Sequence, residues 1–167
     1  MIPVPERRRG PEDACEMPPI DLSRLHVGQV SVDAIIPLRH RMLRQGLPLD
    51  SARFPGDDDQ ATLHFAASES GVPVCCLTLM AAEWEGRDAW QLRGMATASE
   101  FQGQGVGRRL FVHAMAEARR MSPERLMWCN ARVSAIGFYE RVGWGVVSEE
   151  FEIPLAGPHV KMVYRGE

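Results

Sequence analysis

The feature that most constrains this chain is the glycine-rich segment 102–107, which reads Gln-Gly-Gln-Gly-Val-Gly. It stands between a strand-like run, residues 90–97, and a run over 106–121 whose apolar residues recur at helical spacing. Glycines at such a junction let the backbone turn tightly and let a ligand approach closely. The N–H groups of the following helix then face that ligand, and the helix dipole favours negative charge there. The segment therefore predicts a loop that binds a phosphorylated ligand.

Two common phosphate-binding loops fit this segment poorly. A P-loop requires Lys and then Ser or Thr after its last glycine, but Gly107 is followed by Arg108 and Arg109. A dinucleotide fingerprint requires Gly-x-Gly-x-x-Gly, and counting from Gly103 its third glycine position holds Arg108. The acidic residue expected at the end of the next strand is also missing, since Asn130 stands there. A nucleotide-dependent enzyme remains an alternative that predicts tight binding of ATP or NAD.

A third pattern fits, and a second segment supports it. Gln102, Gly105 and Gly107 match Gln/Arg-x-x-Gly-x-Gly/Ala, and residues 130–144 read Asn-Ala-Arg-Val-Ser-Ala-Ile-Gly-Phe-Tyr-Glu-Arg-Val-Gly-Trp. Together they resemble the two motifs of the GNAT family of N-acetyltransferases, with Trp144 in the usual Phe place. The order strand, glycine loop, helix, strand, short helix and Gly-aromatic turn covers residues 90–153 without a gap. The resemblance implies an N-acetyltransferase that uses acetyl-coenzyme A and transfers its acetyl group to a primary amine by direct attack in a ternary complex.

The resemblance also implies a single-domain α+β (α/β) fold, with a mixed, mostly antiparallel, twisted sheet of about seven strands and helices on both faces. The residues themselves predict helices from Asp33, as the N-cap, to Gln45 and over 106–121. We expect residues 1–24, which are rich in proline, to form a flexible arm and residues 25–167 to form the acetyltransferase domain. The predicted strands are 26–32, 61–68, 72–82, 90–97, 125–129, 145–153 and 159–164.

Composition excludes several other classes of protein. A chain of 167 residues is long enough for one domain with a sizeable core. A net charge of −3 argues against non-specific nucleic-acid binding, and no apolar run reaches membrane-spanning length. The four cysteines have no metal or redox spacing, and adjacent Cys75 and Cys76 in an apolar run indicate reduced, buried thiols. We expect a cytoplasmic monomer or homodimer without a metal, whose partners are coenzyme A and a small-molecule or peptide amine.

The resemblance assigns a cofactor site residue by residue. Backbone N–H groups of the glycine loop would bind the pyrophosphate, with Arg108 as a further cation. The pantetheine arm would pair with the strand before the loop, where Gly94 marks either a bulge that opens the sheet or a point of close packing. Asn130 would bond the pantetheine amide, serve as a helix N-cap, or both. The expected cofactor-binding residues are Met95, Ala96, Thr97, Gln102, Gly103, Gln104, Gly105, Val106, Gly107, Arg108, Asn130 and Tyr139.

The catalytic residues are less completely specified. Tyr139 resembles the family's general acid at the leaving thiolate; its alternative is a core aromatic residue. Many members carry a Glu base in the strand equivalent to 90–97, and this chain has none there. His159 is the first candidate for the base, because residues 158–162 resemble a Pro-His-x-x-Met ending found in one branch of the family. His64, Glu152 and a water molecule are the other candidates.

Three further alternatives stay open. Cys129 could carry the acetyl group in a ping-pong reaction or be a buried strand thiol. The run Asp57-Asp58-Asp59 could suggest a metal or be a solvated loop. The missing strand Glu also favours a non-catalytic acyl-coenzyme A sensor of the same fold, and the identity of the acceptor amine is not encoded in any motif.

Overall fold

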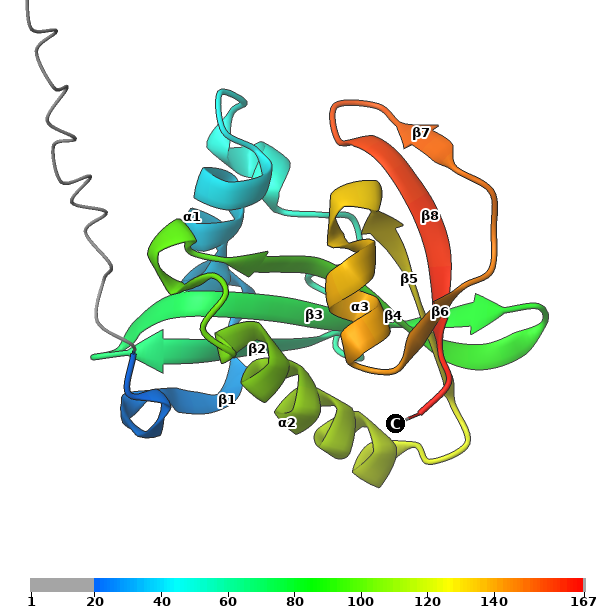
Figure 1. The fold of residues 1–167 in the computed structure, drawn as a ribbon, viewed down its shortest axis with the longest axis horizontal. Coiled ribbons are helices and arrows are strands. Elements are labelled where there is room, and N and C mark those ends of the chain that lie inside the picture. Colours follow the sequence, from blue (N-terminus) through cyan, green and yellow to red (C-terminus); the bar gives the residue numbers. More distant parts are fainter. Residues whose placement is uncertain (1–19, 167) are drawn as a thin grey trace, which may run out of the picture.

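The computed structural model of this protein describes residues 20–166 (Figure 1). Residues 1–19, which make up most of the expected flexible arm, lie outside the described residues, as does Glu167. Residues 20–24 fall within that expected arm but contact the glycine loop: the Ile20 N–H donates to Gln104 Oε1 at 2.9 Å. Arg109 also donates to the Leu22 carbonyl, so this short segment packs beside the start of the long helix.

The centre of the fold is one twisted eight-stranded sheet with the order β1-β2-β3-β4-β5-β8-β6, in which β7 pairs with β8 (Figure 1). All neighbours pair antiparallel except β4 and β5, which are parallel. The strands are β1 (His26–Val30), β2 (Leu63–Glu69), β3 (Val72–Trp84), β4 (Arg87–Thr97), β5 (Leu126–Arg132), β6 (Trp144–Val146), β7 (Phe151–Ile153) and β8 (Gly157–Tyr164). The expected fold class is therefore confirmed.

Helices cover both faces of this sheet. The helices are α1 (Val32–Leu43), α2 (Val106–Met121) and α3 (Ile136–Arg141), with 3-10 turns at Leu22–Arg24, Leu49–Ala52, Ser99–Phe101 and Val133–Ala135. On one face, Arg39 of α1 donates to Thr78 of β3. On the other face, the ring of His113 in α2 contacts Phe65 of β2. Within residues 20–166, none of the helices is long and apolar enough to cross a bilayer.

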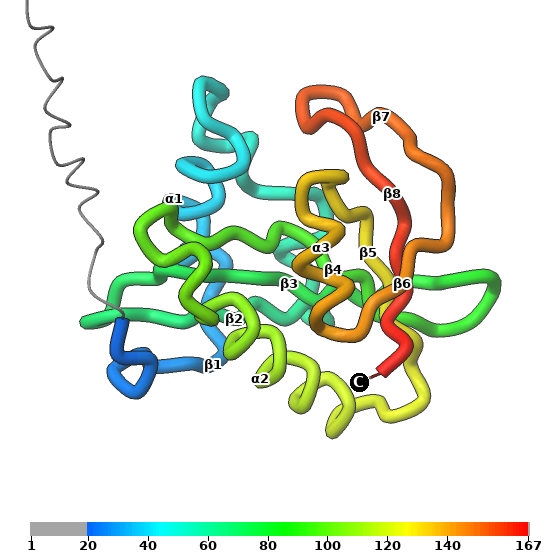
Figure 2. The backbone as a smooth tube through the Cα atoms, viewed as in Figure 1, coloured from blue at the N-terminus to red at the C-terminus, as the bar shows by residue number. Residues whose placement is uncertain are grey.

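The helix α2 and the C-terminal strand meet at one end of the molecule. Four apolar residues of α2 that recur at helical spacing, Val106, Leu110, Ala114 and Ala118, are fully buried, whereas Met121 at the end of the helix is exposed. Figure 2 shows the chain returning along β8 to end beside the far end of α2, where Arg119 lies over the Tyr164 ring at 5.0 Å. This packing fixes α2, and with it the glycine loop, against the sheet.

One detail of the sheet and one of helix α1 differ from the sequence-based expectation. The predicted strand over 145–153 is two short strands, β6 and β7, because the Ser148 hydroxyl accepts the Lys161 N–H at 2.8 Å and interrupts the backbone ladder. The N-cap of α1 is Ser31 rather than Asp33, and Pro37 lies inside the helix. The sheet therefore has eight strands where about seven were expected.

The irregularity that positions the site lies in β4. Pairing with β3 runs from Thr78↔Arg93 to Cys76↔Ala96, so β4 has one extra residue at this point. Gly94 has φ +58°, a conformation that favours glycine, and this is a β-bulge as expected. A Cβ built on Gly94 would lie 2.8 Å from Arg39 Nε, so close packing applies as well.

Candidate active site

The glycine loop forms a cavity at the start of α2, which we call the loop cavity. Its volume is about 720 Å³. Gly105 is the N-cap of α2 with φ +81°, and no side chain of the described chain caps the helix. The first N–H groups of a helix have no partner within it, so the start of α2 is suited to an anionic ligand. The loop cavity is lined by Thr97, Phe101, Gln102, Gly103, Gly105, Val106, Gly107, Arg108, Phe138, Arg141 and Val142.

The two glutamines of the loop have a bracing role in the structure. Gln102 Nε2 donates to the Thr97 carbonyl at 2.9 Å, and Gln104 Nε2 donates to the Glu100 carbonyl at the same distance. Gln104 Oε1 accepts the Ile20 N–H. Because Gln104 lies outside the lining of the loop cavity, its side chain holds the turn rather than facing a ligand.

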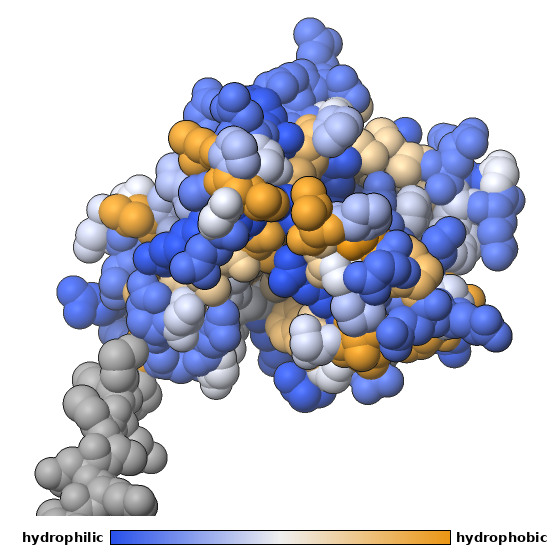
Figure 3. Space-filling model, turned by 90° about the horizontal axis from the view of Figure 1, so that it is seen from above, coloured by the Kyte–Doolittle hydropathy of each residue, from blue (hydrophilic) through white to orange (hydrophobic). Residues whose placement is uncertain are grey.

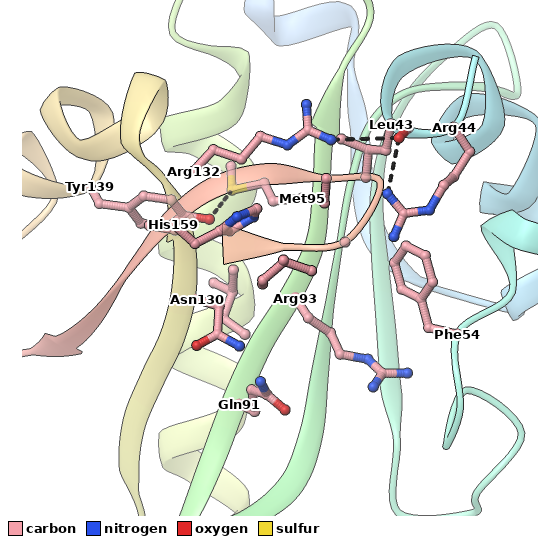
Figure 4. Close-up of a pocket in the computed structure, with 15 residues that line it drawn as sticks. Leu43, Arg44, Phe54, Gln91, Arg93, Met95, Asn130, Arg132, Tyr139 and His159 are labelled. Carbon is pink, nitrogen blue, oxygen red and sulfur yellow. Dashed lines mark hydrogen bonds between the residues drawn. The ribbon is translucent and has the colours of Figure 1, made fainter. Parts of the chain in front are cut away.

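Beyond the loop, β4 and β5 diverge. Their parallel pairing ends at Leu92↔Cys129, while β4 continues to Thr97 and β5 to Arg132. The edge of residues 93–97 that faces β5 therefore has no strand partner. The Thr97 carbonyl accepts from Gln102, and the rest of this edge is open to an extended ligand. This opening leads to a second cavity of about 250 Å³, the strand cavity (Figure 4). It is lined by Leu43, Arg44, Phe54, Gln91, Leu92, Arg93, Gly94, Met95, Asn130, Ala131, Arg132, Tyr139, Ile153, Ala156 and His159.

The structure brings most of the predicted site residues together in these two cavities. Seven of them line the loop cavity: Thr97, Gln102, Gly103, Gly105, Val106, Gly107 and Arg108. Four line the strand cavity: Met95, Asn130, Tyr139 and His159. Ala96 and Gln104 line neither.

Tyr139 lies on α3 with its hydroxyl in the strand cavity. The ring packs at its edges against Phe138 and Trp144, and the hydroxyl donates to Met95 Sδ at 3.9 Å. Burial raises the pKa of Tyr139 well above its usual value, and the neighbouring thiols of Cys129 and Cys75 raise it further. The hydroxyl is therefore protonated at neutral pH, and its present partner, a thioether, is only a weak acceptor.

His159 lies on β8 across the same cavity (Figure 4). Its Nδ1 lies 2.7 Å from the Gly157 carbonyl. A carbonyl only accepts hydrogen bonds, so Nδ1 carries a proton, and Nε2 is the ring nitrogen that is left to accept one. The ring is 6% exposed, and its orientation is fixed by this bond. His159 is thus arranged to accept a proton at Nε2.

Asn130 lies within β5, so it is not the N-cap of the following helix, which was one of its two expected roles. Its Oδ1 is buried and has no hydrogen-bond partner among the described residues. Buried polar atoms are nearly always paired, and Asn130 lines the strand cavity. An unpaired amide oxygen in this position fits a ligand that supplies an N–H group.

The other two side chains considered as the base, His64 and Glu152, do not line the strand cavity. His64 is 6% exposed and both its ring nitrogens are bonded, Nδ1 to Thr78 Oγ1 at 2.7 Å and Nε2 to the Asp57 carbonyl at 2.9 Å. Burial lowers the pKa of His64, so it is a structural residue. Glu152 is exposed on β7 and does not line the strand cavity.

Cys129 is fully buried and lies outside the strand-cavity lining. Burial raises the pKa of its thiol far above the usual value. The thiolate that a covalent acetyl-cysteine would need is therefore strongly disfavoured.

A buried charge network that was not predicted from the sequence lies beneath the bulge. The Arg39 and Asp57 side chains are both 0% exposed, with Arg39 Nη1 2.5 Å from Asp57 Oδ2. Arg93 Nη2 donates to the other carboxylate oxygen at 3.0 Å. Asp57 was expected in a solvated loop, and that expectation is wrong because two guanidinium groups hold its carboxylate in the core.

In residues 20–166, no group of three or more His, Cys, Asp or Glu side chains could hold a metal ion.

The only sequence signal for Arg39 was its position. It lies four residues after Ile35, on the buried stripe of α1, where an apolar residue would normally stand. A charged residue on such a stripe indicates a buried partner elsewhere in the chain, but not which one.

Comparison with known proteins agrees with this geometry. Among solved structures, Escherichia coli ElaA has a TM-score of 0.71 at 15% identity, covering 84% of this chain and 99% of that one. A putative N-acetyltransferase from Lactobacillus plantarum has a TM-score of 0.69 at 19% identity, covering 84% and 97%. An aminoglycoside 6'-N-acetyltransferase complexed with coenzyme A has a TM-score of 0.65 at 13% identity, covering 83% and 95%. At these identities the likeness establishes the fold.

The sequence comparisons establish the family. An uncharacterized N-acetyltransferase of Bacillus subtilis (strain 168), YitI, is 29% identical over 141 residues, which is 83% of this chain and 94% of the relative. The model of the acetyltransferase (GNAT) family matches residues 35–144, which include both motifs and most of the sheet. The chain is therefore an acyltransferase that belongs to the GNAT acetyltransferase family.

Proposed function

We propose that this protein transfers an acetyl group from acetyl-coenzyme A to a primary amine by direct attack in a ternary complex. The observation that carries the proposal is the opening between β4 and β5. The β4 edge at this opening takes part in both cavities: Met95 lines the strand cavity with Tyr139 and His159, and Thr97 lines the loop cavity at the start of α2. Acetyl-coenzyme A needs a site for its phosphates and a site for its thioester at the same time.

The chain's own residues fit coenzyme A at three places. The N–H groups at the start of α2, together with Arg108, would hold the pyrophosphate. The unpaired edge of residues 95–97 would pair with the pantetheine arm as an added strand. The unpaired Oδ1 of Asn130 would accept an amide N–H of that arm. When bound, acetyl-coenzyme A supplies an activated acetyl thioester and leaves as the thiol.

Two side chains would handle the protons. An amine acceptor is mostly protonated at neutral pH and must lose a proton before it can attack. His159 would take that proton at Nε2, since Nδ1 is held by the Gly157 carbonyl. Tyr139 would donate its hydroxyl hydrogen to the departing sulfur, because burial keeps the phenol protonated. The buried, high-pKa thiol of Cys129 supports direct attack over an acetyl-cysteine.

The experiment measures thiol release from acetyl-coenzyme A with a panel of amines, alongside calorimetric binding of coenzyme A. Tyr139→Phe should lower kcat by roughly 10²-fold or more, the usual contribution of a general acid, with little change in coenzyme A binding. Tyr164→Phe is the matched control, because the sequence has only two tyrosines and Tyr164 lies outside both cavities.

Two results would count against the proposal. Wild-type turnover in Tyr139→Phe would remove that residue's role. Tight coenzyme A binding without thiol release for any amine would favour the alternative, a non-catalytic acyl-coenzyme A sensor.

A further inference from the structure

The strand cavity has an unusual charge. Its lining includes the guanidinium groups of Arg44, Arg93 and Arg132, and it includes no Asp or Glu (Figure 4). Sites that receive cationic amines generally supply carboxylates. The lining of this cavity instead favours a substrate that brings negative charge with it.

Arg44 and Arg132 are the two arginines that lack a carboxylate. Arg44 Nη1 donates to the Leu43 carbonyl at 3.0 Å, and Arg132 Nη2 approaches the same oxygen at 3.5 Å. Neither forms an ion pair within residues 20–166. A guanidinium has five N–H donors, so each keeps donors to spare. Burial lowers the pKa of Arg44, and the charge of Arg132 lowers it further, so the two cations are close enough to repel each other.

The third arginine already has a carboxylate partner, which it shares with Arg39. Arg93 bonds the Asp57 carboxylate at 3.0 Å and the Pro55 carbonyl. The Phe54 ring lies beside Arg44 and Arg93, with their Cζ atoms 5.0 Å and 5.6 Å from its centroid. This stacking orders Arg44 before any ligand arrives. Arg44 and Arg132 therefore form the unsatisfied pair.

The pair lies close to the proposed base. Arg132 and His159 are directly opposite each other on β5 and β8, and such cross-strand Cβ atoms lie roughly 4.5–5.5 Å apart. Both residues also line the strand cavity, so an amine at His159 and an anion at Arg132 would occupy the same small pocket. The cavity is also small, about 250 Å³, against roughly 300–1,000 Å³ for sites of drug-sized ligands.

Helix capping alone does not account for the pair. A cation near the last carbonyls of α1 is favourable, and one arginine would be enough for the Leu43 carbonyl. Two guanidinium groups on one neutral oxygen repel each other and gain little. Binding of coenzyme A phosphates does not account for the pair either, because the uncapped helix start lies in the loop cavity, which contains neither arginine.

We infer that the acceptor is a small amine that also carries an oxyanion, a carboxylate or a phosphonate, held by Arg44 and Arg132 with its amine at His159. This inference rests on the proposed N-acetyltransferase function and names the acceptor class. Paired guanidinium forks match the oxygens of either anion. Seen from above, the molecular surface has apolar groups near its middle and hydrophilic groups along much of its rim (Figure 3).

The test compares amines that share one carbon skeleton. For several skeletons, thiol release from acetyl-coenzyme A is measured with the amino acid, its carboxamide, the decarboxylated amine and the aminoalkylphosphonate. At least one anionic amine should exceed its neutral partners in kcat/KM by about tenfold or more, since charge-assisted hydrogen bonds contribute that much. The carboxylate and phosphonate arms identify which anion is preferred.

Variants then locate the anion site. Arg132→Gln and Arg44→Gln should each raise KM for the anionic amine by roughly 10- to 100-fold and remove the preference over the carboxamide, with KM for acetyl-coenzyme A little changed. Arg132→Lys should restore part of the preference. Arg120→Gln is the control, because Arg120 is exposed on α2, pairs with Glu117 and lines neither cavity. Thermal melting of each variant verifies that it is folded.

The outcomes separate this inference from the proposed function. Preferred use of neutral or purely cationic amines by the wild type would overturn the inference and leave the acetyltransferase proposal standing. A preference for anionic amines that survives both glutamine variants in folded protein would overturn the assigned arginines. Coenzyme A binding without thiol release for any amine would overturn the proposed function and this inference with it. Calorimetry provides the same comparison without turnover. It measures the Kd of the N-acetylated anionic product and the Kd of the carboxamide analogue of that product.

Discussion

The buried Arg39–Asp57 pair leads to a sharp prediction for the variant Asp57→Asn. The Asp57 carboxylate accepts hydrogen bonds from Arg39 at 2.5 Å, the Phe54 N–H at 2.7 Å and Arg93 at 3.0 Å. Asparagine has nearly the same shape but no charge. The variant therefore leaves the guanidinium of Arg39, which is 0% exposed, without a compensating anion.

The size of the effect follows from this burial. Removing one partner of a buried ion pair costs about 3–5 kcal/mol of unfolding free energy. For a domain of this length, each kcal/mol lowers Tm by roughly 2–4 °C, so Asp57→Asn should lower Tm by about 6–20 °C. By contrast, Asp58 pairs with Arg53 at 2.5 Å but is 71% exposed. Exposed pairs contribute about 1 kcal/mol or less, which makes Asp58→Asn a neighbouring control.

The pH dependence has a definite sign. Burial raises the pKa of Asp57, but the Arg39 and Phe54 hydrogen bonds and the Arg39 charge outweigh it, so the net pKa is lowered. A carboxyl whose folded pKa is lowered stabilises the protein fully above its unfolded pKa of about 3.9. That contribution is lost as the pH falls through the lower, folded pKa. The difference in Tm between wild type and Asp57→Asn should therefore be constant from about pH 6 to 8 and shrink in acid.

Thermal unfolding followed by circular dichroism at several pH values is the measurement. The reasoning is refuted if Asp57→Asn melts within the small shift of Asp58→Asn at pH 7. It is also refuted if the deficit persists undiminished well below the unfolded pKa, because protonation should by then have removed the wild-type advantage.

Three further variants test the site directly. His159→Gln should lower kcat/KM by roughly 10²-fold or more, as loss of a general base does; wild-type turnover in the folded variant would exclude this base. Gly94→Ala should lower Tm and weaken coenzyme A binding by calorimetry, because its φ is +58° and its Cβ would lie 2.8 Å from Arg39 Nε; wild-type values for both would show that the bulge is not needed. Cys129→Ala should keep its turnover, since the thiol is buried and its pKa is raised; loss of turnover in folded variant, or a wild-type burst of thiol release without amine, would reinstate the acetyl-cysteine route.

The parts of the fold that the sequence predicted well are those set by local pattern. The helix over 106–121 was predicted with its observed bounds, because its apolar stripe ends where Ser122 and Pro123 follow. The bulge at Gly94 was also expected, since a glycine inside a strand usually marks one. In both cases a few neighbouring residues determine the backbone.

The choice of base needed the structure, because it depends on hydrogen bonds that sequence does not encode. His64 and His159 are both buried histidines on strands. His64 has both ring nitrogens bonded, whereas among residues 20–166 His159 has a partner at Nδ1 alone and lines a cavity. The acceptor pocket was beyond the sequence for a related reason: Arg44, Arg93 and Arg132 are far apart in the chain. Only Arg132 lies within a motif segment, and the motif gives it no role.

The bulge also explains how one irregularity in β4 serves both the fold and the site. Along a regular strand, successive side chains face opposite sides of the sheet. In β4, Arg93 contacts Asp57 and Gly94 lies against Arg39, so two consecutive residues face α1. Met95 then turns the other way, toward the Tyr139 hydroxyl. The buried Arg39–Asp57 pair holds this arrangement, and Arg39 is in contact with Gly94. A change in the pair should therefore move the edge of β4 that faces coenzyme A and the Arg93 side of the acceptor pocket together, although neither Arg39 nor Asp57 lines either cavity.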